Sequence, residues 1–170
     1  EGAAAAAAQA YVDLDALRSA PPVEDWERAA TRAKRMSGVA GMLRMMDQLS
    51  AALALQQRAL AIEEAAYGAD HTAVAITLGS MGNVLQQQGK LEEALALQQR
   101  ALAIKEAAYS ADHTAVASTL GNIGDVLQQQ GKLEEALALQ QRALAIEEAA
   151  YGADHTEVAS TLGNMGNVLR

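Results

Sequence analysis

A nearly identical internal repeat constrains this chain more than any other feature. The same segment begins at residues 49, 91 and 133, a spacing of 42 residues. Residues 91–127 and 133–169 differ at only five positions, which are Lys105/Glu147, Ser110/Gly152, Ala115/Glu157, Ile123/Met165 and Asp125/Asn167. Such a period indicates an array of equivalent units, each of which buries its apolar surface against its neighbours.

Each unit predicts two helices. In the first, apolar residues recur at steps of four, three and four, forming one stripe on a helix expected over about residues 72–88; they are Val74, Leu78, Met81 and Leu85. Gly89-Lys90 ends this helix, and a second is expected over about residues 90–109. The second helix carries two apolar stripes, so we expect it to contact both its own partner helix and the next repeat.

Polar residues mark the turns between units. Gly68 and Gly152 follow a tyrosine where a helix end favours left-handed geometry, and Ser110 is expected to fit there less well. We expect Asp70, Asp112 and Asp154 to be N-caps, with Glu157 completing a capping box after Asp154. Each of His71, His113 and His155 follows one of these aspartates and is a whole repeat away from the next, which favours a capping or turn role over a shared metal site.

A continuous coiled coil is the main alternative, because 42 is a multiple of seven. Such a rod would be interrupted about every 20 residues by Gly89, by Gly131 and by the Ala-Asp-His-Thr stretches. The sequence therefore predicts an all-α array of helix hairpins.

Composition excludes several functions. The chain has 13 Lys+Arg against 21 Asp+Glu, and this net charge of −8 argues against general binding of nucleic acid. It has no cysteine, and no apolar run approaches the roughly 18 residues that a membrane helix needs. No nucleophile lies beside a base and no phosphate loop is present, while the glutamate pairs 63–64, 92–93 and 134–135 are expected on solvated faces. We expect no enzyme activity, no metal and no cofactor.

The units carry Thr77-Leu78, Gly82 as the small residue at a helix crossing, residues 88–94 and 100–104, and Asp112-His113 with Val116-Ala117. These motifs resemble the 42-residue tetratricopeptide repeats of kinesin light chains and related scaffold and sensor proteins. The resemblance implies a right-handed superhelical α-solenoid. The resemblance covers residues 49–170 fully and residues 36–48 more weakly. One departure from the family pattern is that Gln56, Gln98 and Gln140 replace a usual tyrosine. We therefore expect the helices to pack less tightly than in a typical member.

The expected organisation is an N-terminal helical extension over residues 1–35 and a repeat array over residues 36–170. The array divides into a degenerate unit 36–71, two full units 72–113 and 114–155, and a partial unit 156–170.

The resemblance also implies a concave wall, formed by the first helix of each unit, that binds an extended peptide or a helix of a partner protein. Its groove positions fall on Ile76, Gly79, Ser80, Asn83, Gln86, Gln87, Ser118, Gly121, Asn122, Asp125, Gln128, Gln129, Ser160, Gly163, Asn164 and Asn167. Asn and Gln both donate and accept, so they can pair with the amides of a bound peptide. The family's basic clamps are absent from these positions, and Asp125 favours a basic or neutral segment.

Six glycines lie inside the first helices, each costing about 1 kcal/mol relative to alanine. Close helix crossing is the expected reason for Gly82, Gly124 and Gly166. For Gly79, Gly121 and Gly163, room for a ligand and drift among recently duplicated units both remain open.

The two ends of the chain are candidate docking regions. We expect a helix over residues 1–18 and a second after Pro21-Pro22, which either covers the first repeat or docks on another protein.

A basic stretch from residue 28 to 44 is either a solvated face or a contact for an anionic partner. The last apolar stripe has no second helix to cover it, so we expect either that the protein continues past Arg170, which we favour, or that a partner covers this face. The docking candidates are Trp26, Arg28, Arg32, Arg35, Leu162, Met165 and Leu169.

Three functions remain open. The first is a scaffold or adaptor that binds a peptide or helix of another protein. The second is a structural or linker subunit of a large assembly, held through its N-terminal helices and open end. The third is the sensor region of a longer signalling ATPase.

Overall fold

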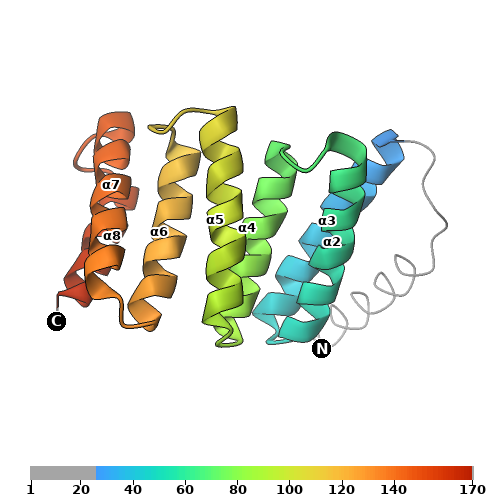
Figure 1. Cartoon of the computed structure of the whole chain (residues 1–170), viewed down its shortest axis with the longest axis horizontal. Helices are drawn as coiled ribbons and strands as arrows, with labels where there is room; N and C mark the ends of the chain where they lie inside the picture. Colours follow the sequence, from blue (N-terminus) through green and yellow to red (C-terminus); the bar gives the residue numbers. More distant parts are fainter. Residues whose placement is uncertain (1–25, 170) are drawn as a thin grey trace.

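The described residues, 26–169 of the computed structural model, form a row of helices that are mostly paired into hairpins (Figure 1). The helices are α2 (Trp26–Met45), α3 (Leu49–Tyr67), α4 (Thr72–Gln87), α5 (Leu91–Ala108), α6 (Thr114–Gln129), α7 (Leu133–Tyr151) and α8 (Thr156–Val168). The predicted helices over residues 72–88 and 90–109 are thus confirmed as α4 and α5. The all-α array of helix hairpins is confirmed, and the coiled-coil alternative is wrong.

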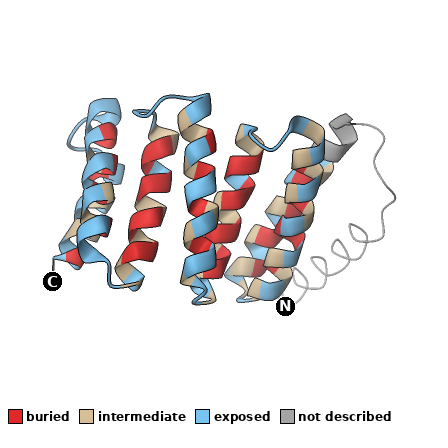
Figure 2. Cartoon of the chain, viewed as in Figure 1, coloured by how far each residue is buried: buried red, intermediate tan, exposed pale blue. Residues whose placement is uncertain are grey.

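Each second helix packs against two neighbours, as its two apolar stripes predicted. α5 forms a hairpin with α4 and also packs against α6, and α7 does the same with α6 and α8. Equivalent core clusters recur one repeat apart: Val74, Leu78 and Ile104 in one match Val116, Leu120 and Ile146 in the next. Figure 2 shows buried residues along α4 and α6. Most residues of α8 are exposed or half-buried.

Histidines, rather than aspartates, cap the first helices, so the predicted N-caps at Asp70, Asp112 and Asp154 are wrong. The Nδ1 atoms of His71, His113 and His155 accept the backbone N–H two residues ahead, at 3.1 to 3.2 Å. Each imidazole also stacks on the tyrosine four residues before it, with ring centroids 4.4 to 4.6 Å apart. This stacking holds the ring over the helix start, and the capping role expected for the histidines is confirmed.

The shift of the cap by one residue also removes the predicted capping box. Glu157 is the second residue of α8 and donates its backbone N–H to His155. In the same turns, three residues before the capping histidines, Gly68 and Gly152 have φ of 90° and 85°, as expected. Ser110 does not adopt that conformation, and α5 ends one residue earlier than α3 and α7.

Buried glutamines occupy the space between the two helices of a hairpin. Gln98 is fully buried, and its Nε2 donates to Gly79 O at 3.0 Å and to Asn83 Oδ1 at 2.8 Å. A Cβ at Gly82 would lie 2.8 Å from that Nε2, and a Cβ at Gly124 would lie 3.1 Å from Gln140 Cγ. Close crossing is therefore confirmed for these two glycines.

The same explanation is wrong for Gly166. A Cβ there would have no atom within 4 Å, because among the described residues no following helix brings a glutamine against α8.

Some sequence predictions fall outside the described residues. They concern residues 1–25, Arg170 and the side chains of Trp26 and Arg28, although both of the last two belong to α2. The boundary placed between residues 35 and 36 falls within α2, which is one helix over that region. Between residues 26 and 169 no helix has the length and apolar character needed to cross a membrane.

Candidate interaction surface

The first helices of the repeats form a continuous surface, which we call the inner wall. α4 packs directly on α6, and α6 packs directly on α8. All sixteen predicted groove positions lie on these three helices, and none of them is buried. Ile76, Ser118 and Ser160 are exposed, as are Gln87, Gln129, Gly163 and Asn167; the others are half-buried.

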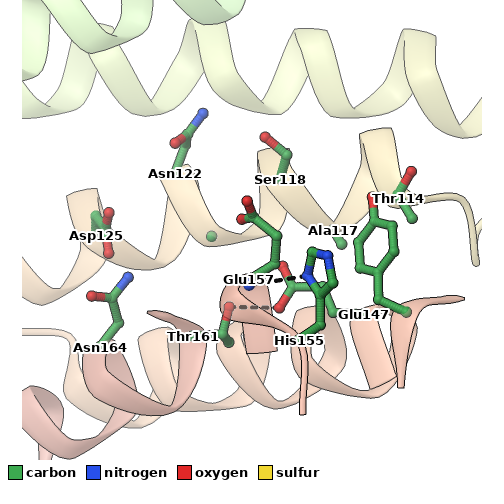
Figure 3. A pocket seen from close by; sticks show the side chains of 12 residues that line it. Thr114, Ala117, Ser118, Asn122, Asp125, Glu147, His155, Glu157, Thr161 and Asn164 are labelled. Carbon is green, nitrogen blue, oxygen red and sulfur yellow. Dashed lines mark hydrogen bonds between the residues drawn. The ribbon is translucent and has the colours of Figure 1, made fainter. Parts of the chain in front are cut away.

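A polar cavity of about 470 Å³ lies between α6, the end of α7 and α8, and we call it the last inter-repeat pocket (Figure 3). It brings together five of the predicted groove residues: Ser118, Gly121, Asn122, Asp125 and Asn164. The rest of its lining was not predicted from the sequence and comprises Thr114, Ala117, Glu147, Tyr151, His155, Glu157 and Thr161. Figure 3 shows Asp125 and Asn164 toward one end of the pocket, Glu147 and His155 toward the other, and Glu157 between them.

A similar cavity of about 430 Å³, the first inter-repeat pocket, lies between α2, the end of α3 and α4. It is lined by Thr31, Lys34, Ser37, Glu63, Tyr67, Ala73, Ile76 and Thr77. Six of these positions are the equivalents, two repeats earlier, of residues that line the last pocket. The two cavities are therefore one structural feature of the array, formed twice with different side chains.

A glutamate of the second helix lines each pocket. Glu63 is only 7 % exposed and Glu147 only 8 %. The Thr161 hydroxyl donates to Glu147 Oε2 at 2.7 Å. The prediction that the 63–64 pair lies on a solvated face is therefore wrong for Glu63, because the end of α3 packs against α4.

The remaining acidic residues behave closer to expectation. The pairs 92–93 and 134–135 are exposed, as predicted. Glu64 is half-buried and accepts from Arg100 of the next repeat at 2.6 Å, and Glu106 accepts from Arg142 at 2.7 Å. The two Arg–Glu ion pairs link neighbouring repeats. They are accessible to solvent, so each contributes at most about 1 kcal/mol to stability.

Burial perturbs three ionisable groups along this surface. It raises the pKa of Glu63, although the Thr77 hydroxyl and the charge of His71 offset part of the effect. It lowers the pKa of Lys105, which occupies the position equivalent to Glu63 and Glu147. It raises the pKa of Asp125, where the neighbouring Gln140 side chain offsets part of the effect.

The raised pKa of Asp125 predicts that the folding stability of the chain depends on pH. The folded chain holds this proton more tightly than the unfolded chain does, so stability falls as pH rises through the folded-state pKa. Asp125→Asn, which introduces the residue present at positions 83 and 167, is therefore expected to be more stable than the wild type at neutral pH. In urea unfolding this advantage should vanish as pH falls below the ordinary Asp pKa of about 3.9. A wild type that is the more stable protein at pH 7 would contradict the assignment.

No group of three or more His, Cys, Asp or Glu side chains within residues 26–169 is arranged to hold a metal ion.

A comparison with protein families decides the relationship. The sequence profile of the tetratricopeptide repeat matches residues 31–107 and 115–170. The chain belongs to the tetratricopeptide repeat family. The fold implied by the kinesin-light-chain resemblance is confirmed, since a solved structure named as a kinesin light chain shares it. No curated protein sequence matches the chain.

Two solved structures illustrate the shared fold. BtubC (BKLC) from P. vanneervenii superposes with a TM-score of 0.77 at 20 % identity, over 91 % of this chain and 60 % of BtubC. A Podosopora anserina protein named as a kinesin light chain, with nearly identical tetratricopeptide-like repeats, gives 0.76 at 17 % identity, over 86 % of this chain and 67 % of that protein. This tetratricopeptide array therefore spans less than two thirds of the length of BtubC.

Tetratricopeptide repeats generally mediate protein–protein interaction and are typically scaffolds without catalytic activity. The family thus supports an interaction role, and the geometry of the inner wall suggests how it is performed.

Proposed function

We propose that this chain is a scaffold or adaptor that binds an extended segment or a helix of another protein along its inner wall. The observation that carries the proposal is the last inter-repeat pocket, where residues of three successive helices converge on one open cavity. Asn122 and Asn164 line it, and their amides can donate to and accept from a peptide backbone. The surface has no metal cluster among its described residues, and we assign it no catalytic role.

Gly121 offers a direct test of this proposal. A Cβ at Gly121 would have no atom within 4 Å, so a lysine there fits the fold and gains helix propensity of about 0.8 kcal/mol. The same lysine projects into the pocket, so Gly121→Lys is expected to lose most binding of peptides selected on the wild type from a random library. Ala103→Lys, an exposed position on the second helix α5, is the control for added charge. Equal retention of the selected peptides by both variants would exclude the inner wall as the binding site.

A second candidate is a structural or linker subunit that docks through its ends, and the exposure of α8 favours it. Leu162 is 49 % exposed and Leu169 is 71 % exposed, with Met165 half-buried, whereas Leu120 at the position equivalent to Leu162 is fully buried. At the other end Arg35 is exposed and Arg32 half-buried.

Crosslinking with mass spectrometry separates the two candidates. Adducts on α4, α6 and α8 along the inner wall support the adaptor. Adducts confined to residues 1–45 and to the exposed stripe of α8 support the structural subunit.

A further inference from the structure

At one position the charge changes sign between units that are otherwise almost identical. This position holds Glu63 in α3, Lys105 in α5 and Glu147 in α7. Each side chain bonds to the threonine at the same place on the following helix: Glu63 to Thr77, Lys105 Nζ to Thr119 Oγ1 at 2.7 Å, and Glu147 to Thr161. Successive repeats therefore present an acid, a base and an acid at one structural position.

Neither glutamate forms an ion pair with a Lys or Arg among the described residues, although the charge of His71 acts on Glu63. Each is more than nine-tenths buried, and the ion pairs that link neighbouring repeats use Glu64 and Glu106 instead. In the first inter-repeat pocket, Glu63 Oε2 is buried and accepts no hydrogen bond. A buried carboxylate oxygen without a donor is costly. A basic side chain that enters the cavity can supply this oxygen with a donor.

The last inter-repeat pocket is the more acidic of the two. Asp125 and Glu157 line it together with Glu147, and no Lys or Arg is among its lining residues. The equivalent positions one repeat earlier hold Asn83, Lys105 and Ala115. The first pocket is intermediate, because exposed Lys34 lines it together with Glu63. Three of the five differences between residues 91–127 and 133–169 thus fall at residues that set the charge of this surface.

We propose that the first and last inter-repeat pockets each bind a basic side chain, arginine or lysine, of the partner segment, and that Lys105 disfavours one at the middle position. This inference rests on the proposed function and adds the chemistry of the partner. A guanidinium or ammonium donates charge-assisted hydrogen bonds to the free carboxylate oxygens and satisfies Glu63 Oε2. Both cavities fall within the size range of ordinary ligand pockets, about 300 to 1,000 Å³.

The test uses a labelled peptide of about twelve residues that alternates Gly and Arg, long enough when extended to span about 40 Å. Fluorescence anisotropy at about 0.15 M salt measures its affinity, because long-range attraction is then screened beyond about 8 Å. Glu147→Gln, which keeps the shape and can still accept from Thr161, is expected to weaken binding about tenfold, and Glu63→Gln less. Lys105→Glu recreates the residue of the neighbouring repeats beside the same threonine, and it is expected to strengthen binding.

The matched control is Glu134→Gln, which removes the same charge from an exposed position in the first turn of α7. It is expected to change the affinity less than about twofold. Equal losses for Glu134→Gln and Glu147→Gln would overturn the inference, because they would reduce the binding to a general effect of the net charge. A peptide alternating Gly and Gln that binds as tightly as the Arg peptide would overturn it as well.

The same assay distinguishes failure of this inference from failure of the proposed function. If Gly121→Lys abolishes binding of library-selected peptides while Glu147→Gln leaves the Arg peptide unaffected, the inner wall binds without selecting basic residues. If neither variant has an effect, the inner wall is not the binding surface.

Discussion

Gly82→Ala is expected to destabilise the chain by about 2 to 4 kcal/mol, whereas Gly166→Ala, at the equivalent position two repeats later, is expected to stabilise it by about 1 kcal/mol. At Gly166 the new methyl group meets no atom within 4 Å, so only the better helix propensity of alanine remains. At Gly82 the methyl group would lie 2.8 to 3.0 Å from three atoms of Gln98. The same substitution at two equivalent positions is therefore expected to change stability in opposite directions.

The cost at Gly82 comes from the way Gln98 is held. Its side chain is fully buried and donates to Gly79 O and Asn83 Oδ1. To accept the methyl group it must give up these bonds, worth about 1 kcal/mol each, and it leaves a buried amide unsatisfied at a further cost of about 1 to 3 kcal/mol. Helix propensity returns about 1 kcal/mol of this.

Urea unfolding followed by circular dichroism measures both single variants. The double variant Gly82→Ala/Gln98→Ala supplies the control, because without the Gln98 side chain the methyl group has room, and the two losses should fall clearly short of additive. Additive losses would show that the glycine is needed for another reason. A stabilised Gly82→Ala would show that Gln98 moves away freely.

Much of the fold could be predicted because each unit repeats its pattern almost without change. The stripe from Val74 to Leu85 fixes α4 through its helical spacing, and the two stripes of α5 anticipate its contacts with α4 and α6. These are local patterns, so they survive in any context. Details that depend on the neighbouring repeat were harder to predict. Gly166 shares its sequence environment with Gly82, yet only Gly82 meets a glutamine of a following helix.

The caps and the pockets show the same limit. Adjacent Asp and His are both polar, and the usual N-cap preferences favour Asp. The clue to the true cap was the tyrosine four residues before each histidine, on which its ring stacks.

The sequence indicated the burial of Glu63 only weakly. Leu55, Ala59 and Glu63 follow at steps of four on one stripe of α3, and all three are buried. The groove positions themselves came from the family resemblance and lie on the first helices. The side chains that complete each pocket come from the end of the second helix, whose docking on the next repeat the sequence alone does not specify.

Leu120→Ala is expected to destabilise the chain by about 3 kcal/mol, and Leu162→Ala by less than about 1 kcal/mol, although the two leucines occupy the same position of successive units. Leu120 is fully buried in a cluster with Val116 and Ile146, where truncation leaves a cavity. Leu162 is 49 % exposed, because no helix among the described residues packs against α8 on that side. Half of its surface therefore contributes nothing to folding.

Urea unfolding at several protein concentrations measures this difference and tests the state of the exposed stripe at the same time. If the chain is a monomer, the stability losses of Leu120→Ala and Leu162→Ala should both be independent of protein concentration. A loss at Leu162 that approaches that at Leu120 and grows with concentration would mean that copies of the chain cover α8 in solution. The leucine pair thus measures how much each hairpin depends on the next one for its stability, because sequence and position are matched and only the neighbouring helix differs.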